Sequence, residues 1–283
     1  MSRALEAALG ALVGATVASL RRVGGGDIND AFEARLTDGT RLFVKTREGA
    51  PSGMYAREAE GLRWLGEARA LPVPEVIAAD DRMLVLAWVE AAARAHDFDE
   101  QLGRGLAQLH RAGAPGFGLS RDNFIGPLVQ DNGACANWSA FYQTRRLAPL
   151  VDRAQRAGLV AARERARFDA LYAKLDALVG PDEAPARLHG DLWSGNVHTD
   201  ARGAPVLIDP AVYGGHREVD LAMLQLFGAP SARFFAAYDE VYPRAPRHDE
   251  RVALYQLYYL LVHVNLFGGS YAGQLSRALG RYA

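Results

Sequence analysis

The hydrophobic pattern changes character along the chain, and this change constrains the fold more than any other feature. Between residues 17 and 45, apolar and polar residues alternate on either side of a turn at residues 37–39, which predicts an antiparallel β-hairpin. Beyond residue 97, apolar residues recur every three or four positions, as in amphipathic helices. Helices are predicted there over residues 102–113, 138–155, 162–178, 219–227, 232–242 and 249–267.

A boundary between two lobes is predicted after the strand-rich part. Residues 55–68 have a helical pattern, the apolar run at residues 83–89 suits a buried strand, and an alanine-rich stretch follows it. A chain of 283 residues is long enough for two lobes around a cleft. We therefore expect an α+β fold, with residues 1–89 as a small, mainly antiparallel-β lobe containing one helix and residues 90–283 as a larger, mainly helical lobe.

The apolar segment at residues 7–20 must be weighed as a signal peptide or membrane helix. Glu6 precedes it, Gly10 and Gly14 interrupt it, and no run of the chain reaches the roughly 18 apolar residues that span a bilayer. We expect a short helix that runs into a strand.

The charge balance limits the partners of the protein. Lys and Arg number 32 and Asp and Glu number 33, so no long-range field attracts the molecule to nucleic acid or to an anionic membrane. The single cysteine, Cys135, excludes an internal disulfide and a metal site made of several thiolates. It also fits a reducing cytoplasm, where we expect the protein to act.

Residues 187–209 interrupt the helical half with a loop rich in His, Asp and Asn. Asp191 and Asn196 lie five residues apart, and Asp209 follows thirteen residues later, after a strand-like run. Phosphoryl transfer needs a carboxylate near the acceptor hydroxyl and oxygen ligands for magnesium. Asp191 is therefore the candidate proton acceptor, and Asn196 and Asp209 are the candidate Mg²⁺ ligands. The alternative is that these residue types only form turns.

A lysine and a glutamate of the first lobe form a second candidate pair. Lys45 ends a predicted strand, where a phosphate-binding lysine would lie. Glu58 shares the apolar face of its predicted helix with Tyr55, whereas Glu60 points the other way. A carboxylate on a buried face needs a cationic partner, so we expect Glu58 to pair with Lys45. A strand-end lysine can also be merely solvated.

Two further segments are candidates for binding ATP. The amides of Gly25 and Gly26, in the run from Gly24 to Asn29, can approach phosphates closely, although glycines in a hairpin turn need no ligand. The backbone of Ala87, Trp88 and Val89 would contact adenine if residues 83–89 form a hinge strand. An ordinary buried strand is equally compatible with these residues.

Three residues of the helical half have structural interpretations. Asp220 lies near the start of a predicted helix, where it would cap the helix or brace the catalytic loop. His110 and His263 lie in apolar helices and are expected to be satisfied core histidines.

At this point the residues resemble the fructosamine kinases, also called ketosamine-3-kinases, which are related to aminoglycoside and choline kinases. The variant of the catalytic loop with Trp193 and the Asp209-Pro210 pair are the most specific features. The matching pieces run through most of the chain: Gly24–Asn29, Phe43-Val44-Lys45, Asp122–Gly126, Leu188–Val197, Asp209–Glu218 and Leu266–Tyr271.

The resemblance implies a two-lobed protein-kinase-like fold and the use of ATP and Mg²⁺. It implies phosphorylation of the sugar O3 hydroxyl of ketosamines, such as ribulosamine, erythrulosamine or fructosamine adducts of amines or protein lysines. The product releases the amine, so the activity would repair glycation. Trp193 could supply an apolar wall for the sugar, with Asn123 and His189 as further substrate residues. The alternative for Asn123 is a turn packed by its aromatic neighbour.

The resemblance leaves regulation and assembly less defined. Some relatives carry a cysteine in the phosphate loop that can link two chains, whereas this loop has Asp27. Redox control through the loop is therefore not expected, and we expect a monomer or weak dimer.

Two rival functions remain open from the sequence. One is a kinase of another small alcohol, such as an aminoglycoside, homoserine or a choline-like compound. An aminoglycoside site should be lined with carboxylates, and the cluster of Asp97, Asp99 and Glu100 is too small and too far from the motifs to indicate one. The other rival is a catalytically silent nucleotide-binding protein.

Overall fold

The computed structural model describes residues 2–24 and 29–282. The chain forms two compact units. The first unit consists of Met1–Phe98 and Asn196–Pro210, and the second of Asp99–Gly195 and Ala211–Ala283. Residues 196–210 thus belong to the first unit although they follow much of the second in sequence. The functional lobe division at residue 89 stays a prediction.

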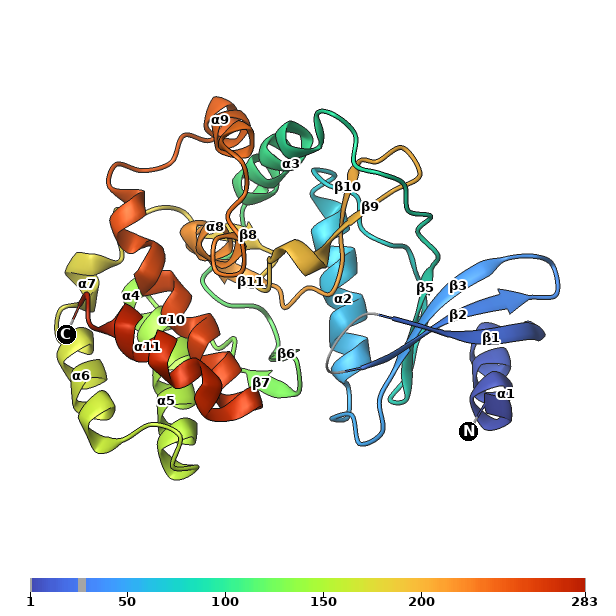
Figure 1. Ribbon diagram of the computed structural model, residues 1–283, viewed down its shortest axis with the longest axis horizontal. Coiled ribbons are helices and arrows are strands. Elements are labelled where there is room, and N and C mark those ends of the chain that lie inside the picture. The colour runs from blue at the N-terminus through green and yellow to red at the C-terminus, as the bar shows by residue number, and fades with distance from the viewer. Residues whose placement is uncertain (1, 25–28, 283) are drawn as a thin grey trace. The chain divides into compact units, whose positions relative to one another are not determined.

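An antiparallel sheet forms the centre of the first unit (Figure 1). The predicted hairpin is present, and its strands pair with Ala31 opposite Lys45. Lys45 also lies opposite Leu84 in the predicted hinge strand, so the strand order places it in the interior of the sheet. The sheet has the order β1 (Val17–Val23), β2 (Asp30–Leu36), β3 (Arg41–Thr46), β5 (Met83–Ala87) and β4 (Val76–Ala79).

Helix α1 (Ser2–Val13) covers one face of this sheet. Leu9 is fully buried in a core with Ala34, Val44 and Val85 from three different strands. Burying a leucine in this way contributes roughly 1.5–3 kcal/mol. The apolar N-terminal segment is therefore a helix that packs on the sheet and leads into β1, as the sequence predicts.

Helix α2 (Met54–Glu67) packs against β4 and β5. It begins after Gly53, whose φ of 78° lies in the left-handed region. Tyr55, Leu62 and Leu65 are buried along one face. This periodicity fixes which glutamate of the helix can reach the sheet.

A small hairpin of β9 (Val197–Thr199) and β10 (Pro205–Leu207) completes the first unit. The Leu207 amide donates to the Pro72 carbonyl at 2.9 Å, and the Ala92 amide donates to the Asp200 carbonyl at 3.2 Å. These backbone hydrogen bonds explain why residues 196–210 group with the N-terminal part of the chain.

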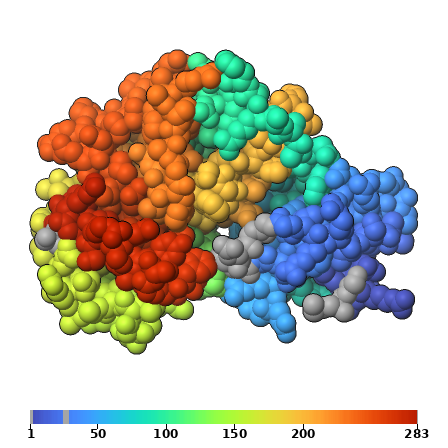
Figure 2. Space-filling view, viewed as in Figure 1, coloured from blue at the N-terminus to red at the C-terminus, as the bar shows by residue number. Residues whose placement is uncertain are grey.

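The second unit is mainly helical, as predicted. Its longest helix, α10, has ten of its 20 residues buried and contacts α5, α8 and α11. Figure 2 shows α10 and α11 on the surface at the red end of the colour bar. The α-helices are α3 (Phe98–Ala112), α4 (Trp138–Phe141), α5 (Ala148–Arg156), α6 (Ala162–Tyr172), α7 (Leu175–Leu178), α8 (Glu218–Leu224), α9 (Ala232–Val241), α10 (His248–Phe267) and α11 (Ala272–Leu279).

Short strands and tight turns lie among these helices. The predicted helix over residues 138–155 contains a π-helical stretch, Tyr142–Leu147, between α4 and α5. Two small antiparallel pairs are formed by β6 (Asn123–Ile125) with β7 (Leu128–Gln130) and by β8 (Ala186–Leu188) with β11 (Tyr213–Gly215). Two 3₁₀ turns occur at Ser194–Asn196 and Gly268–Tyr271.

Within residues 2–24 and 29–282, every helix is too short or too polar to cross a membrane.

Candidate active site

The first unit brings Lys45 and Glu58 together, as the sequence predicts. Lys45 Nζ lies 2.8 and 2.9 Å from the two carboxylate oxygens of Glu58. Both side chains are about nine-tenths buried, so the ammonium and the carboxylate neutralise each other away from solvent. Glu60 is instead half exposed and pairs with Arg57. The positions of the two glutamates around the helix therefore predicted correctly which one pairs with Lys45.

Asp209 forms a third member of this charged group. Its Oδ1 atom lies 3.2 Å from Lys45 Nζ, and its side chain remains 39% exposed. The lysine thus holds one buried carboxylate and one that faces outward. Burial lowers the pKa of Lys45, but the carboxylates of Asp209 and Glu58 more than offset this effect, so the pKa lies above its ordinary value. Lys45 is a cation at physiological pH.

Burial shifts the pKa of Glu58 in the direction opposite to that of Lys45, because Glu58 is an acid. Burial raises the pKa of Glu58, and the neighbouring Lys45 cation opposes that shift. Removing the Lys45 ammonium would leave this carboxylate buried without its counter-charge, which is strongly unfavourable. The two side chains therefore depend on each other.

Asp209 has an unusual backbone. Its φ is 53°, in the left-handed region that a residue with a side chain rarely adopts. Such strain typically costs on the order of 1–3 kcal/mol and is found at functional sites. Two hydrogen bonds surround it, because Asn196 Nδ2 donates to the Asp209 carbonyl at 3.4 Å and the Ile208 amide donates to the Asn196 carbonyl at 3.1 Å. The two predicted magnesium ligands are neighbours in the first unit.

The donors at this place suit magnesium. A carboxylate and an amide are hard oxygen ligands, and Mg²⁺ is usually held by one or two protein oxygens together with phosphates and water. Within the described parts of the chain, no group of three or more His, Cys, Asp or Glu side chains forms a full metal cage. Asn196 and Asp209 are thus the residues that could hold the ion.

The predicted hinge segment has two of its three amides engaged in the sheet. The Ala87 amide donates to the Glu75 carbonyl at 2.9 Å, and the Trp88 amide donates to the Arg41 carbonyl at 3.2 Å. The Arg41 guanidinium lies 4.6 Å from the centre of the Trp88 ring. The contacts of this segment with adenine stay a prediction. Gly25, Gly26 and Asp27 lie outside the described residues.

In the second unit, Asp220 organises the loop that carries Asp191. Its two carboxylate oxygens accept hydrogen bonds from the amides of His189 and Gly190, at 2.8 and 2.9 Å. His110 Nε2 lies 3.3 Å from the same carboxylate, and its Nδ1 lies 2.7 Å from the Tyr238 hydroxyl. Asp220 and His110 are completely buried. The predicted bracing role of Asp220 and the core position of His110 are confirmed.

The backbone next to Asp191 is held equally firmly. Gly190 has a φ of 82°, and a Cβ atom there would lie 2.0 Å from the Ala211 carbonyl oxygen, so only glycine fits. The Tyr259 hydroxyl donates to the Gly190 carbonyl at 2.9 Å. The Asp191 amide donates to His189 Nδ1 at 3.2 Å, and the Asp191 side chain is half-buried. The carboxylate is therefore mounted on a rigid loop.

The three predicted substrate residues have different surroundings. Trp193 is 38% exposed, which suits a wall for a ligand. His189 is fully buried. Asn123 is also buried, where its amide donates to the Val212 carbonyl at 2.8 Å and its oxygen accepts from Gln130 and Asn132 at 2.7 and 2.9 Å. These contacts favour an internal bracing role for His189 and Asn123 over direct contact with the substrate.

Comparison with known proteins places these residues in one family. The family model described as fructosamine kinase matches residues 1–283. The chain belongs to the fructosamine kinase family. A chloroplastic protein-ribulosamine 3-kinase of Oryza sativa subsp. japonica is 33% identical over 281 residues, which cover 94% of this chain and 79% of the relative. As a member of a kinase family, the protein uses ATP as its phosphoryl donor.

Solved structures agree with this family and with the predicted fold. The crystal structure of a fructosamine-3-kinase candidate from Thermobifida fusca YX-ER1 is 40% identical, with a TM-score of 0.92, and the match covers 100% of this chain and 99% of that one. Choline kinase LicA from Streptococcus pneumoniae shares only the fold, at 15% identity and a TM-score of 0.67 over 99% of both chains. The α+β, protein-kinase-like fold is confirmed.

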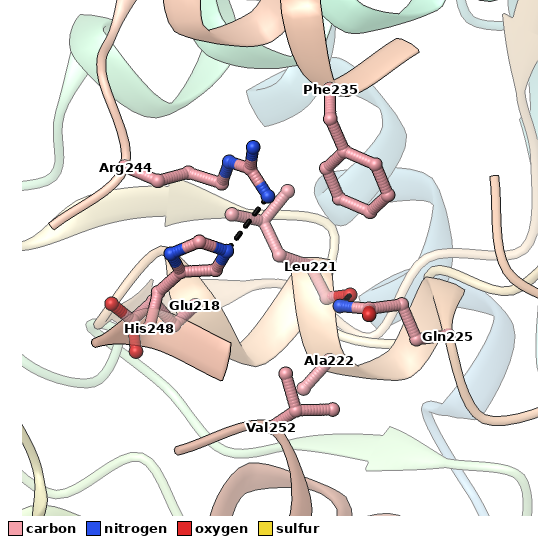
Figure 3. A pocket seen from close by; sticks show the side chains of 8 residues that line it. All are labelled: Glu218, Leu221, Ala222, Gln225, Phe235, Arg244, His248 and Val252. Carbon is pink, nitrogen blue, oxygen red and sulfur yellow. Dashed lines mark hydrogen bonds between the residues drawn. The ribbon is translucent and has the colours of Figure 1, made fainter. Parts of the chain in front are cut away.

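A pocket elsewhere in this fructosamine kinase family member carries none of the predicted site residues. Figure 3 shows it between α8, α10 and the segment around Arg244. Its charged groups are already engaged, because Arg244 pairs with Asp239 and donates to His248 Nε2 at 2.7 Å, while Glu218 pairs with Arg251. The pocket is lined by Glu218, Leu221, Ala222, Gln225, Phe235, Arg244, His248 and Val252.

Sequence reasoning missed the residues that support the site from behind. Tyr259 and Gln130 make buried hydrogen bonds to the backbone at Gly190 and Ala211. Nothing in their local sequence marks them, because aromatic and amide residues are common in helices and short strands. Only the long-range fold brings them to the catalytic segments.

Proposed function

We propose that this protein transfers the γ-phosphoryl group of ATP to the O3 hydroxyl of a ketosamine. The observation that carries the proposal is the position of Lys45, bound at once to Glu58 and to Asp209 within one unit. A buried lysine clamped by one carboxylate and next to a second, exposed one is the arrangement that phosphoryl transfer requires. Membership of the fructosamine kinase family supports the ketosamine as acceptor.

The residues of the first unit would hold the nucleotide. The Lys45 ammonium neutralises phosphate oxygens, and Glu58 keeps that ammonium in place. Asn196 and Asp209 would hold Mg²⁺, which neutralises charge on the phosphates when bound. The outward-facing carboxylate of Asp209 supports this role, since a metal ligand must be accessible.

Asp191 of the second unit would act on the acceptor. As the O3 oxygen forms its bond to the γ-phosphorus, the bond from that phosphorus to the β,γ-bridging oxygen breaks and ADP leaves with the electron pair. Asp191 accepts the proton that O3 loses. The hydrogen bonds that the His189 and Gly190 amides donate to Asp220 keep the Asp191 carboxylate in position before the substrate binds.

The biological consequence is a repair reaction. A ketosamine phosphorylated at O3 is unstable and releases its amine, so the activity would reverse glycation of amines or of protein lysines. Ribulosamines and erythrulosamines are the preferred sugars in this proposal, and the Oryza relative is named for a ribulosamine. The single cysteine fits action in a reducing cytoplasm, and a monomer or weak dimer stays the expected assembly.

Two of the three carboxylates in the acidic cluster do not support the aminoglycoside alternative. Asp99 bonds to Ser231, and Glu100 pairs with Arg233 at 2.5 Å. These carboxylates are engaged within the fold and are not arranged to meet several ammonium groups.

The proposal is tested by offering Mg²⁺ and ATP with a ribulosamine, a fructosamine or an aminoglycoside in parallel. We expect ATP consumption with a ketosamine, and a phosphate on O3 that couples to C3 in the NMR spectrum of the ¹³C-labelled product. Phosphorylation of the aminoglycoside alone would overturn the substrate. Tight nucleotide binding without transfer to any acceptor would overturn the activity.

A further inference from the structure

Five ring-bearing side chains of the second unit form a continuous cluster, which we call the aromatic surface. It consists of Trp193, Phe227, His263, Phe267 and Tyr271. His263 is central, with ring centres 5.0 Å from Phe227, 5.6 Å from Phe267 and 4.8 Å from Tyr271. Trp193 meets the edge of the cluster through Phe227, at 6.0 Å.

Much of this cluster is open to solvent. Trp193, Phe227 and Phe267 are 38%, 39% and 44% exposed. Within the described parts of the chain, the other large hydrophobic side chains of comparable exposure are Ile77 and Val129. Clustering of exposed aromatic rings at one place marks a binding surface, whereas scattered ones need no explanation.

The backbone is adapted to the tryptophan. A Cβ atom on Gly195 would lie 2.3 Å from the Trp193 ring, so the indole rests directly on the glycine backbone. This glycine supports one side of the ring and leaves the exposed part available to a ligand. Trp193 is also only two residues from Asp191 in the chain.

His263 adds a polar atom to the cluster. Its Nδ1 atom lies 2.7 Å from the Tyr259 carbonyl oxygen, which can only accept, so Nδ1 carries the hydrogen. In the neutral ring, Nε2 then holds a lone pair. Burial lowers the pKa of His263, with the bond to Tyr259 opposing that shift, so the ring is neutral at physiological pH.

We infer that the aromatic surface binds the secondary ammonium of the ketosamine and the alkyl stem next to it. This inference rests on the proposed function and names the part of the substrate that the sugar hydroxyl chemistry does not use. A secondary alkylamine is protonated at neutral pH, and a cation is attracted to the faces of Trp, Tyr and Phe rings. The Nε2 lone pair of His263 can accept a hydrogen bond from an N–H group of this ammonium. The exposed rings cover the apolar stem.

The inference predicts discrimination between two acceptors that differ only in the amine. The probes are the n-butylamine adduct of whichever sugar the wild type phosphorylates fastest and the matching 1-deoxyketose, which has no nitrogen. The measured quantity is the ratio of kcat/KM for the first probe to kcat/KM for the second. Both probes carry the same hydroxyl, so effects on phosphoryl transfer itself cancel in the ratio.

The variants change the charge and the ring of one exposed residue. We expect Phe227→Leu to lower the ratio about threefold through loss of one ring, and Phe227→Lys to lower it about twentyfold because a cation now repels the ammonium. Phe267→Leu provides a second site and should resemble Phe227→Leu. Val129→Lys adds the same charge at another exposed apolar position of this unit and should leave the ratio within twofold.

The outcomes separate the inference from the proposed function. A wild type that phosphorylates neither probe contradicts the proposed function. A wild type that is active, with Phe227→Lys and Val129→Lys giving the same ratio, overturns the inference alone. Circular dichroism and thermal unfolding identify a variant that has not folded, and Phe267→Leu then decides the question by the same ratio.

Discussion

Two sets of carboxylates, one in each unit, are held in different ways. In the first unit, Glu58 and Asp209 face the Lys45 ammonium, and Glu33 accepts from Arg21 and Arg41. In the second unit, Asp220 faces two backbone amides. Side-chain ion pairs can exchange one partner for the charges of a ligand, whereas a carboxylate bound to the backbone fixes the shape of a loop.

The two kinds of contact fit two different roles in the proposed reaction. A charged nucleotide and its metal would be received by side chains that already balance each other. The acceptor hydroxyl would be received by Asp191 on a loop whose backbone is set in advance. Substitutions in the first unit should therefore change nucleotide binding, and substitutions in the second should change turnover.

Replacing the proton acceptor should have the largest effect. We expect Asp191→Asn to lower kcat by about 10²- to 10⁴-fold, because the amide cannot take the hydroxyl proton. The dissociation constant for ATP, measured by calorimetry, should stay within twofold. Equal losses of turnover and of nucleotide affinity would contradict the proposal that Asp191 acts on the acceptor and not on ATP.

The second largest effect is expected when the Asp220 carboxylate is removed from the loop that carries Asp191. Asp220→Ala leaves the buried amides of His189 and Gly190 without an acceptor, at about 1–3 kcal/mol for each group. We expect a free energy of unfolding lower by about 2–6 kcal/mol in urea and a kcat reduced about tenfold or more. Asp249→Ala, at an exposed position in α10, serves as the control and should change neither quantity appreciably.

The glutamate pair of α2 offers a matched test in the first unit. Glu58→Gln removes the counter-charge of buried Lys45, and we expect the KM for ATP to rise about tenfold. Glu60→Gln removes only an exposed partner of Arg57 and should leave the KM within twofold. Similar values for the two variants would show that the buried pair has no part in holding the nucleotide.

The smallest effect is expected from Glu33, through pH. Hydrogen bonds from Arg21 and then Arg41, opposed by burial, hold the pKa of Glu33 at about 2 instead of 4.5. The unfolded chain therefore binds this proton more readily, so the contribution is complete above about pH 4.5 and is lost as the pH falls toward 2. The difference in melting temperature between wild type and Glu33→Gln should shrink over that range. A constant difference would contradict the pairing.

The sequence predicted those parts of the fold that local patterns determine. The hairpin of β2 and β3, the helix α2 and the long helices of the second unit follow from hydrophobic periodicity. The choice of Glu58 over Glu60 followed from helical phase in the same way.

Other features depend on contacts that no local pattern encodes. The three-residue strands β6, β8 and β11 are too short to show a period, and each is recognisable only with its partner. The left-handed backbone of Asp209 gives no signal, since Asp is ordinary in turns. The family resemblance placed Asn123 among the predicted substrate residues, and nothing in its local sequence shows that distant segments bury it.

The magnesium dependence of turnover in two variants shows whether the metal and the proton are held by different units. Because Asp209 would hold the metal, we expect Asp209→Asn to raise the magnesium concentration for half-maximal turnover at least tenfold, with partial recovery at high magnesium. Asp191→Asn should keep the wild-type half-maximal concentration within twofold while turning over slowly at every concentration. If both variants shift the magnesium requirement equally, or only Asp191→Asn shifts it, the assignment of metal binding and proton transfer to different units is wrong.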